Sequence, residues 1–377
     1  MTRCRAVPEV EEPESERTCG ERAASVRLSN QQGDNMTSAA ISTAHSRTPG
    51  HRAQSVRLGR RLLATVALAC VVPWSLAATP AWTPPGPVRL VVPYAPGGGT
   101  DVLARIVASH IGNALGQPLI VENRPGVNGI LGANHVYGAP ANGTTLLFAA
   151  ADFISVSPHI YKKAVKYDPN GFTPVALVAR MGFVLASKES SGTKSAAEFV
   201  AQARSKEITY GHWGPGSMSQ MGMELLRSKA EGTKALPIPY AGAAPVLAAV
   251  MAGDVEYGFV PTPLAVASKS KLKLIALGSP ERFPAIGDVP TLKEQGYGVD
   301  SDTWFGVLAP PNTPQAAIEV LQAHVNKVVQ DAVVRARMAE IGYTPSNIEP
   351  RDFGTFVRAE NARWGAVVKA ANIQVEE

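Results

Sequence analysis

The sequence predicts an α/β protein of two lobes whose folded part begins near residue 82. From there on, short apolar runs alternate with amphipathic segments, as in layered α/β folds. The length of about 300 residues is ample for a hydrophobic core and favours two lobes. No internal repeat and no low-complexity segment is visible after residue 82.

The first group of predicted elements lies between residues 88 and 186. The helix over Asp101–Leu115 is predicted because Val102, Ile106 and Ile111 fall on one stripe. A second helix is predicted over Ile130–Tyr137. The apolar runs predict strands at Val88–Val92, Leu119–Glu122, Thr145–Ala149, Thr173–Ala179 and Phe183–Ala186.

A second group of α/β units follows, and helices close the chain. Helices are predicted at Ser195–Ser205, Met218–Ala230 and Pro245–Ala252, and strands at Ile208–Tyr210, Leu236–Pro239, Tyr257–Val260 and Leu272–Ala276. A late strand is predicted at Phe305–Ala309. The closing helices are predicted at Pro314–Val329, Asp331–Ile341 and Pro350–Ala371.

Residues 57–81 have the pattern of a secretory signal. Arginines precede an apolar core over residues 62–72, which is too short to span a bilayer, and small residues allow cleavage near Ala77. A buried core helix, or a lipoprotein cut before Cys70, are the alternatives. Residues 1–56 are polar and precede the signal, so we interpret them as a disordered extension or the product of a start codon assigned too early, with Met36 as one alternative start.

Cysteine and charge distribution exclude several classes of protein. Cys4, Cys19 and Cys70 all precede the predicted cleavage, so the mature chain forms no disulfide and no cysteine-ligated metal site. Ten of the 36 Lys and Arg and seven of the 31 Asp and Glu precede residue 78, leaving a charge of about +2. No basic run remains, so nucleic acid is not an expected partner. No later apolar stretch is long enough to cross a membrane.

The stretch "VPYAPGGGTDVLAR", residues 92–105, predicts an anion site. A strand ends, glycines follow, and a helix begins, which leaves unpaired backbone N–H groups at the positive end of the helix dipole. Gly97, Gly98, Gly99, Thr100 and Asp101 are therefore candidates to hold a carboxylate, with Thr100 or Asp101 capping the helix. An ordinary capped turn is the alternative. A dinucleotide fingerprint would need a third glycine where Val102 stands.

A second stretch, "YGHWGPGSMSQMGMELL" over Tyr210–Leu226, repeats the arrangement of strand, glycine-rich loop and helix. Ser217 or Ser219 lies near the start of that helix. Two such loops, one in each group of units, could face each other across a cleft, where small ligands bind.

The sequence of the mature chain gives little indication of a catalytic or metal-binding site. It contains no Gly-x-Ser-x-Gly motif, and its histidines show no metal-ligand spacing. His212 lies in the second loop, where it is expected to form loop hydrogen bonds rather than act as a base. We expect no catalytic residue, no metal and no cofactor.

Seven ordered blocks resemble the Bug family, the TctC-like receptors of tripartite tricarboxylate transporters. They cover roughly residues 86–371 and read "VVPYAPGGGTDVLAR", "ENRPGVNGILGANHV", "NGTTLLF", "YDPNGFTPVALVA", "IPYAGAAPVLAAVMAGDVEYGF", "IGDVPTLKEQGY" and "DTWFGVLAPPNTP". The resemblance implies a type II periplasmic binding protein, a non-enzymatic monomer whose two lobes are joined by crossover strands and close over a ligand. It implies one lobe from residues 82–183 and 306–377 and another from 184–305.

The resemblance also implies a ligand and a partner. The ligand would be a small carboxylate (a dicarboxylate, an amino acid or an aromatic acid), delivered to membrane subunits of a tripartite transporter. A sensor of the same fold, or a secreted enzyme acting on a small acid, are the alternatives. The implied ligand-binding residues are Tyr94, Pro96, Gly97, Gly98, Gly99, Thr100, Asp101, Ala151, Asp152, Phe153, Gly214, Gly216, Ser217, Met218, Ser219, Tyr240, Gly242, Ala243, Val260 and Thr303.

This chain departs from the family pattern at several of these positions. Gln220, Ala241 and Val260 stand where relatives often have His, Lys and a polar residue. Asp152 is an added acid. Facing the ligand, it would favour a cationic or amino group and repel a tricarboxylate. A solvated loop acid or a helix cap is the alternative.

Overall fold

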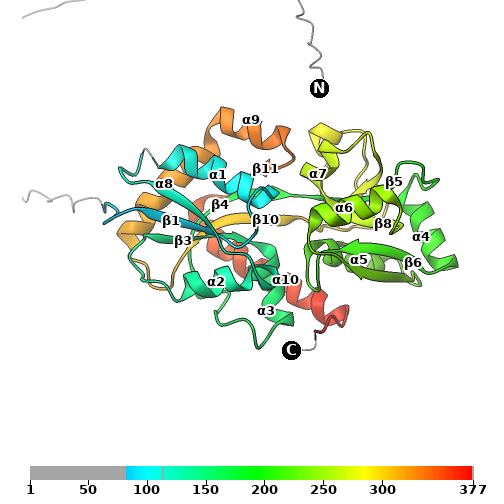
Figure 1. Cartoon of the computed structure of the whole chain (residues 1–377), viewed down its shortest axis with the longest axis horizontal. Helices are drawn as coiled ribbons and strands as arrows, with labels where there is room; N and C mark the ends of the chain where they lie inside the picture. The colour runs from blue at the N-terminus through cyan, green and yellow to red at the C-terminus, as the bar shows by residue number, and fades with distance from the viewer. Residues whose placement is uncertain (1–81, 113, 376–377) are drawn as a thin grey trace, which may run out of the picture. The chain divides into compact units, whose positions relative to one another are not determined.

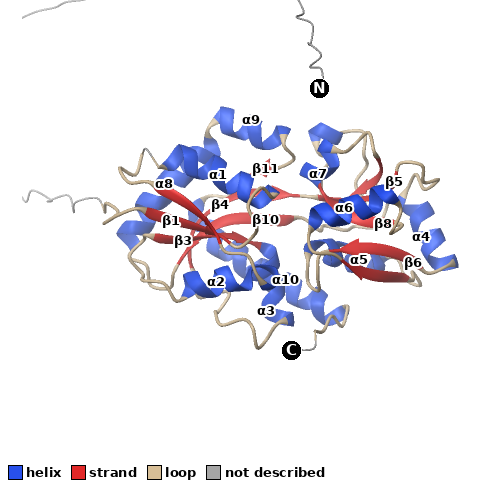
Figure 2. Ribbon diagram, viewed as in Figure 1, coloured by secondary structure: helices blue, strands red, loops and turns tan. Residues whose placement is uncertain are grey.

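The strands form two mixed sheets, each flanked by helices (Figures 1 and 2). The computed structural model describes residues 82–375 except residue 113. The predicted signal and the extension before it lie outside these residues. None of the helices in the described part of the chain has the length and hydropathy that a membrane span requires.

The first sheet has six strands in the order β11-β4-β10-β3-β1-β2. β1 pairs in parallel with both β2 and β3, and β10 inserts antiparallel between β3 and β4. The carboxyl ends of β1 and β3 therefore lie at one edge, where ligands bind in open α/β sheets. The strands are β1 (Val88–Val92), β2 (Leu119–Asn123), β3 (Thr145–Ala150), β4 (Thr173–Met181), β10 (Thr303–Ala309) and β11 (Thr344–Pro345).

The second sheet has five strands in the order β7-β6-β8-β5-β9. Here β6 lies between its parallel neighbours β7 and β8, as β1 lies between β2 and β3, and the antiparallel strand β5 takes the place of β10. The two sheets thus share one arrangement that no sequence repeat reveals. The strands are β5 (Phe183–Lys188), β6 (Ile208–His212), β7 (Ala235–Pro239), β8 (Tyr257–Pro261) and β9 (Leu272–Leu277).

The helices cover both sheets, and the C-terminal ones return to the first. α8 packs on β4 and α1, and α10 packs on β4 and on the segment after β3. The α-helices are α1 (Gly99–Ile111), α2 (Ile130–Tyr137), α3 (Ser157–Ile160), α4 (Ala196–Ser205), α5 (Met218–Lys229), α6 (Ala243–Ala252), α7 (Thr262–Ala267), α8 (Gln315–Gln330), α9 (Ala332–Glu340) and α10 (Phe353–Ala370).

Every predicted strand and helix after residue 82 is present, with differences at the ends. The helix predicted over Asp101–Leu115 begins two residues earlier and ends at Ile111, followed by a turn that Gly116 completes with φ +67°. The segment after β3, predicted as a loop, forms a π-helix over Asp152–Val156 that continues into α3.

The chain crosses between the sheets at Gly182 and again before Thr303. β4 ends at Met181 and β5 begins at Phe183, while Thr303 pairs with Met181 as β10 begins. An ideal Cβ on Gly182 would overlap the Ser279 hydroxyl and lie 3.2 Å from Asp302 Oδ1, so a side chain here would require Ser279 to move. The lobe limits at residues 183/184 and 305/306 remain predictions.

A cluster of charged groups lies at the same crossing. Arg180 Nη2 is 3.4 Å from Asp300 Oδ2 and 3.6 Å from Asp302 Oδ2. Asp302 also accepts a hydrogen bond from the Ser279 hydroxyl. Burial raises the pKa of Asp302 to about 7, against the lowering effect of Arg180. The crossing therefore carries an acid whose charged form is disfavoured.

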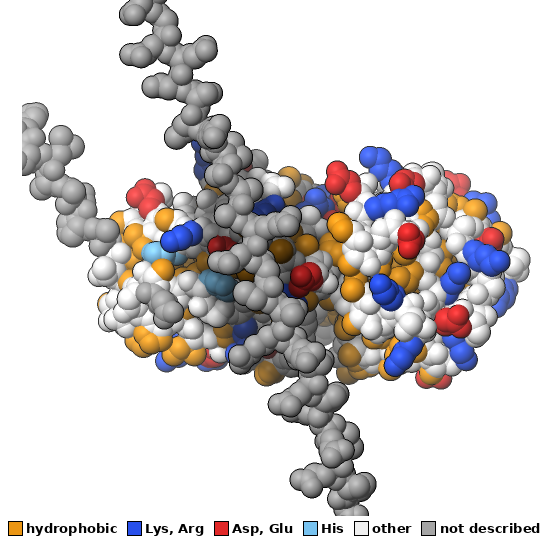
Figure 3. All heavy atoms as spheres, turned by 90° about the horizontal axis from the view of Figure 1, so that it is seen from above, with side chains coloured by type: hydrophobic (Ala, Val, Ile, Leu, Met, Phe, Trp, Pro, Cys, Tyr) orange, Lys and Arg blue, Asp and Glu red, His pale blue; other side chains and the backbone are white. Residues whose placement is uncertain are grey.

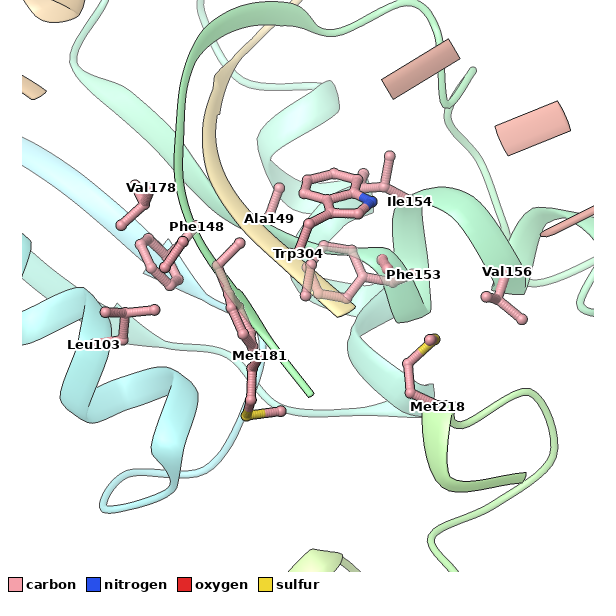
Figure 4. Packing of buried hydrophobic residues seen from close by; sticks show 14 of the residues in the cluster. Leu103, Phe148, Ala149, Phe153, Ile154, Val156, Val178, Met181, Met218 and Trp304 are labelled. Carbon is pink, nitrogen blue, oxygen red and sulfur yellow. The ribbon is translucent and has the colours of Figure 1, made fainter. Parts of the chain in front are cut away.

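The main hydrophobic core runs from the first sheet into the second. Trp304 is 1% exposed and lies edge-on to Phe353, with ring centroids 5.7 Å apart. Figure 4 shows Trp304 close to Ile154 and Phe153, and Met218, at the start of α5, pointing toward the same region. On the face that Figure 3 shows, Lys and Arg are interspersed with Asp and Glu rather than gathered by sign.

Candidate functional site

The first glycine loop (residues 93–98), between β1 and α1, is held by the carboxylate of Asp101. Asp101 is 3% exposed, and its Oδ2 accepts hydrogen bonds from the Gly97 amide and from Arg105 Nε, both at 2.9 Å. Its Oδ1 accepts from Asn123 Nδ2 at 2.9 Å, and that amide also donates to the Tyr94 carbonyl. The Asp101 side chain therefore shapes the loop. It does so from the third position of α1, and its role as a ligand contact stays a prediction.

Backbone amides at the start of α1 have no hydrogen-bond partner among the described residues. The N-cap is Gly98, in extended conformation (φ −74°, ψ 164°), and no side chain caps the helix. No described residue accepts a hydrogen bond from the amides of Gly98, Gly99 or Thr100. Gly98 and Gly99 are exposed. The start of α1 thus offers free donors at the positive end of a helix dipole, as an anion site requires.

Tyr343, which the sequence reasoning missed, lies against these amides. An ideal Cβ on Gly99 would be 2.5 Å from the Tyr343 hydroxyl. That side chain is 1% exposed, and its hydroxyl has no hydrogen-bond partner within the described part of the chain. Buried hydroxyl groups are normally satisfied, whereas this one is an unpaired donor next to Gly99 among the described residues. No local sequence motif identifies Tyr343. It comes close to Gly99 only because the chain returns from α9 to the first sheet at β11.

The second glycine loop (residues 213–217), between β6 and α5, is built in the same way. Gln220 Oε1 accepts from the Gly216 amide at 2.8 Å, as Asp101 does from Gly97, and in each case the acceptor is the third residue of the helix. Gly216 and Gly97 have φ values of +74° and +81°, which favour glycine. The N-cap Ser217 is fully buried, and its hydroxyl finds no partner among the described residues.

The second glycine loop packs against the first lobe. Tyr161 Oη, which follows α3, donates to the Pro215 carbonyl at 3.0 Å. An ideal Cβ on Gly216 would lie 2.6 Å from Ile160 Cδ1, so the loop packs directly on α3. Ser219 donates its hydroxyl hydrogen bond to the Gly211 carbonyl, within its own lobe, and is fully buried.

Asp152 joins the two lobes at the start of α5. Its Oδ1 accepts a hydrogen bond from the Met218 amide at 3.4 Å. The side chain is 6% exposed, and burial raises its pKa to about 6, although Met218, its own backbone amide, Trp213 and Thr303 lower it. Asp152 is therefore not a solvated loop acid; it accepts from the first amide of α5 and so acts as a helix cap, the second alternative. Its carboxylate accepts the hydrogen bond of the Met218 amide, which we expected to contact a ligand.

Three predicted ligand contacts are core residues. The Phe153 ring is fully buried against Tyr94, with centroids 6.0 Å apart, and beneath Gly129. Ala151 is fully buried as well. Val260 lies inside β8, pairs with Val184, and belongs to the apolar cluster under α6. The side chains of these three residues are fully buried.

The remaining predicted residues lie around the same edges. Thr303 is 1% exposed, and its hydroxyl forms no standard hydrogen bond to a described residue, although it lies close enough to lower the pKa of Asp152. Tyr240, Gly242 and Ala243 are half-buried at the start of α6. The Tyr240 amide donates to the His212 carbonyl, so this segment borders the second loop. Pro96 is exposed on the first glycine loop, and Gly214 is half-buried on the second.

His212 forms loop hydrogen bonds, as predicted. Its Nδ1 accepts from the Gly214 amide at 3.2 Å, and burial lowers its pKa. Among the residues that the structure describes, no group of three or more His, Cys, Asp or Glu could hold a metal ion. A surface hollow of about 590 Å³ lies at the amino ends of β1 and β3, opposite the glycine loop, and includes Arg89 and His135. It is not part of the candidate site.

Comparison with known proteins agrees with this geometry. The model of the tripartite tricarboxylate transporter family receptor (TctC) matches residues 103–373. The chain belongs to this receptor family. BugT of Bordetella pertussis is 30% identical to this receptor over 329 residues, which cover 84% of the chain and 99% of BugT.

Solved structures of relatives share the receptor's fold. Rpa4515 of R. palustris, solved with adipate, has a TM-score of 0.72 and 30% identity, covering 78% of this chain and 99% of that one. MatC of Rhodopseudomonas palustris, with bound malate, has a TM-score of 0.69 and 31% identity, covering 76% and 99%. BugD is described as a periplasmic binding protein. The family is named as a receptor and BugD as a binding protein, neither of them as an enzyme.

Proposed function

We propose that this receptor binds a small carboxylate between its two lobes in the periplasm and delivers it, as a monomer, to the membrane subunits of a tripartite tricarboxylate transporter. The observation that carries the proposal is the free start of α1. The unpartnered amides of Gly98, Gly99 and Thr100 lie beside the buried, unpartnered hydroxyl of Tyr343. Backbone amides and a hydroxyl hold an anion without a basic side chain.

The solved relatives support this ligand chemistry. Adipate and malate are both small carboxylates. The contacts between the lobes, from Asp152 to Met218 and from Tyr161 to Pro215, join the segment after β3 to the second glycine loop and the start of α5. For a ligand to bind there, the lobes would have to part at these contacts or close around the ligand. Ligand binding is thereby coupled to lobe movement.

The experiment is a ligand screen of the purified protein by thermal shift, followed by calorimetry on each hit. At a hundredfold excess over the dissociation constant, a ligand adds about 2.7 kcal/mol to the stability of the protein that binds it. We expect at least one small carboxylate to raise the melting temperature and to be recovered unchanged. No response to any carboxylate, or conversion of the ligand, would contradict the proposal.

A further inference from the structure

We propose that Asp152 serves as a built-in anion at the start of α5 and selects ligands that carry one carboxylate and one ammonium group. This inference rests on the proposed function and narrows it to a substrate class. It rests on three observations about the described residues. They are the position of the Asp152 side chain, the Met218 amide already bonded at the start of α5, and the lack of a Lys, Arg or His paired with Asp152.

The two helix starts are equivalent in construction but not in occupancy. Both have an extended N-cap residue without a side-chain cap, and both have a third residue that reaches back to a glycine amide. At α1 the first-turn amides are free. At α5 the Met218 amide already donates to Asp152. A ligand carboxylate therefore meets free amides at the start of α1, whereas at α5 a second carboxylate would lie next to the Asp152 carboxylate that already holds the first amide.

The carboxylate of Asp152 has hydrogen-bond donors but no cation. The groups that act on it are the amides of Met218 and of Asp152 itself and the side chains of Trp213 and Thr303, all uncharged. In the described part of the chain, no Lys, Arg or His forms an ion pair with it. A buried charge without a partner is costly. A ligand ammonium group would supply the missing countercharge.

Asp152 also lies close to the open anion site in the fold. It follows β3, whose neighbour β1 leads into the first glycine loop, and Phe153 packs on Tyr94 of that loop. A small molecule can thus place a carboxylate at the α1 amides and an ammonium group toward Asp152. A dicarboxylate in the same position would bring a second negative charge toward a buried one, which disfavours its binding.

The experiment is calorimetry at pH 7.5 with matched probes of three to six carbons. Each set comprises α- and ω-amino acids, the straight-chain monocarboxylate and the dicarboxylate of equal length. The proteins are the wild type, Asp152→Asn, and Asp302→Asn as a control that removes a buried carboxyl group at the crossing, without contact to α5. Asparagine keeps an acceptor for the Met218 amide and removes the charge.

We expect the wild type and Asp302→Asn to bind at least one amino acid tenfold or more tightly than the monocarboxylate and dicarboxylate of its length. Asp152→Asn should lose that preference. Tighter binding of a dicarboxylate by the wild type, or a preference that survives in Asp152→Asn, would overturn the inference while leaving the proposed function intact. If no carboxylate binds the wild type, both fail. Should Asp152→Asn not fold, the wild-type selectivity alone decides.

Discussion

The Met218 amide donates a hydrogen bond to the Asp152 carboxylate, 3.4 Å away, and so joins the segment after β3 to the start of α5. The two residues are 66 positions apart, and Asp152 follows β3 of the first sheet while Met218 follows β6 of the second. The contact gives the receptor an acid inside its candidate site, at a place where a helix dipole stabilises negative charge. The amides at the start of α1 remain free to bind an anion, whereas the first amide of α5 is already bonded to Asp152.

Replacing Gly98 by valine should abolish ligand binding and leave the fold intact. The backbone of Gly98 is extended, and a Cβ there would meet only the Ala95 carbonyl, at 3.7 Å, so valine fits. A side chain at the N-cap lies over the first-turn amides and would cover them. We expect affinity to fall at least tenfold in calorimetry, with a melting temperature within a few degrees of wild type.

The control for this variant is Gly192→Val, in an exposed loop of the second lobe where a Cβ meets nothing within 4 Å. Its affinity should equal that of the wild type. Wild-type affinity in Gly98→Val would mean that the first glycine loop is only a turn.

Tyr343→Phe should weaken binding without weakening the fold. Its hydroxyl has no hydrogen-bond partner within the described residues, so phenylalanine removes an unsatisfied buried group. We expect an unchanged or higher melting temperature and a loss of about 0.5–1.5 kcal/mol in binding, roughly three- to tenfold. Calorimetry and thermal denaturation measure the two effects separately.

Tyr257→Phe is the matched control, because the Tyr257 hydroxyl is hydrogen-bonded to Gln202 and Thr193 within the second lobe. It should lose about 1 kcal/mol of stability and bind normally. Equal affinities for wild type and Tyr343→Phe would remove Tyr343 from the site.

Asp101→Asn should destabilise the protein by about 1–3 kcal/mol at neutral pH, because a hydrogen-bonded carboxylate is lost. Burial raises the pKa of Asp101, but hydrogen bonds from Arg105, the Gly97 amide and Asn123 outweigh it, and the pKa lies below its ordinary value. A lowered pKa adds stability above the unfolded-state pKa near 4, and that stability is lost as pH falls through the folded-state value. Denaturant titrations of both proteins should therefore converge in acid; a constant gap would contradict this account.

Asp302→Asn should change the pH dependence of stability in the direction opposite to that of Asp101→Asn. Burial raises the pKa of Asp302 to about 7, so between pH 4 and 7 the folded state holds more protons than the unfolded state. Wild-type stability should then fall as pH rises through this window, and Asp152, with a pKa of about 6, adds to the fall. The stability of Asp302→Asn relative to wild type should grow from pH 4.5 to 8 in urea titrations. Parallel curves would show that Asp302 does not ionise in this range.

The local structure was predictable because its causes are local. The alternation of apolar runs set the strands, and the glycines before Thr100 and Met218 placed both helix starts within two residues. Positive φ at Gly97 and Gly216 depends on the lack of a Cβ, which is visible in the sequence. The Bug-type blocks gave the family, which the TctC match confirms.

The sequence by itself therefore determined the elements, the family and the two glycine loops. Only the tertiary structure decided which side chains meet there. It placed the Tyr343 hydroxyl beside Gly99, turned Val260 into the core, engaged Asp101 within its loop and brought Asp152 to Met218. Asp101 finds two of its partners, Gly97 and Arg105, within four residues. The other three contacts depend on how separate elements pack, because their partners are distant in the chain and periodicity predicts which residues are buried but not which residues they contact.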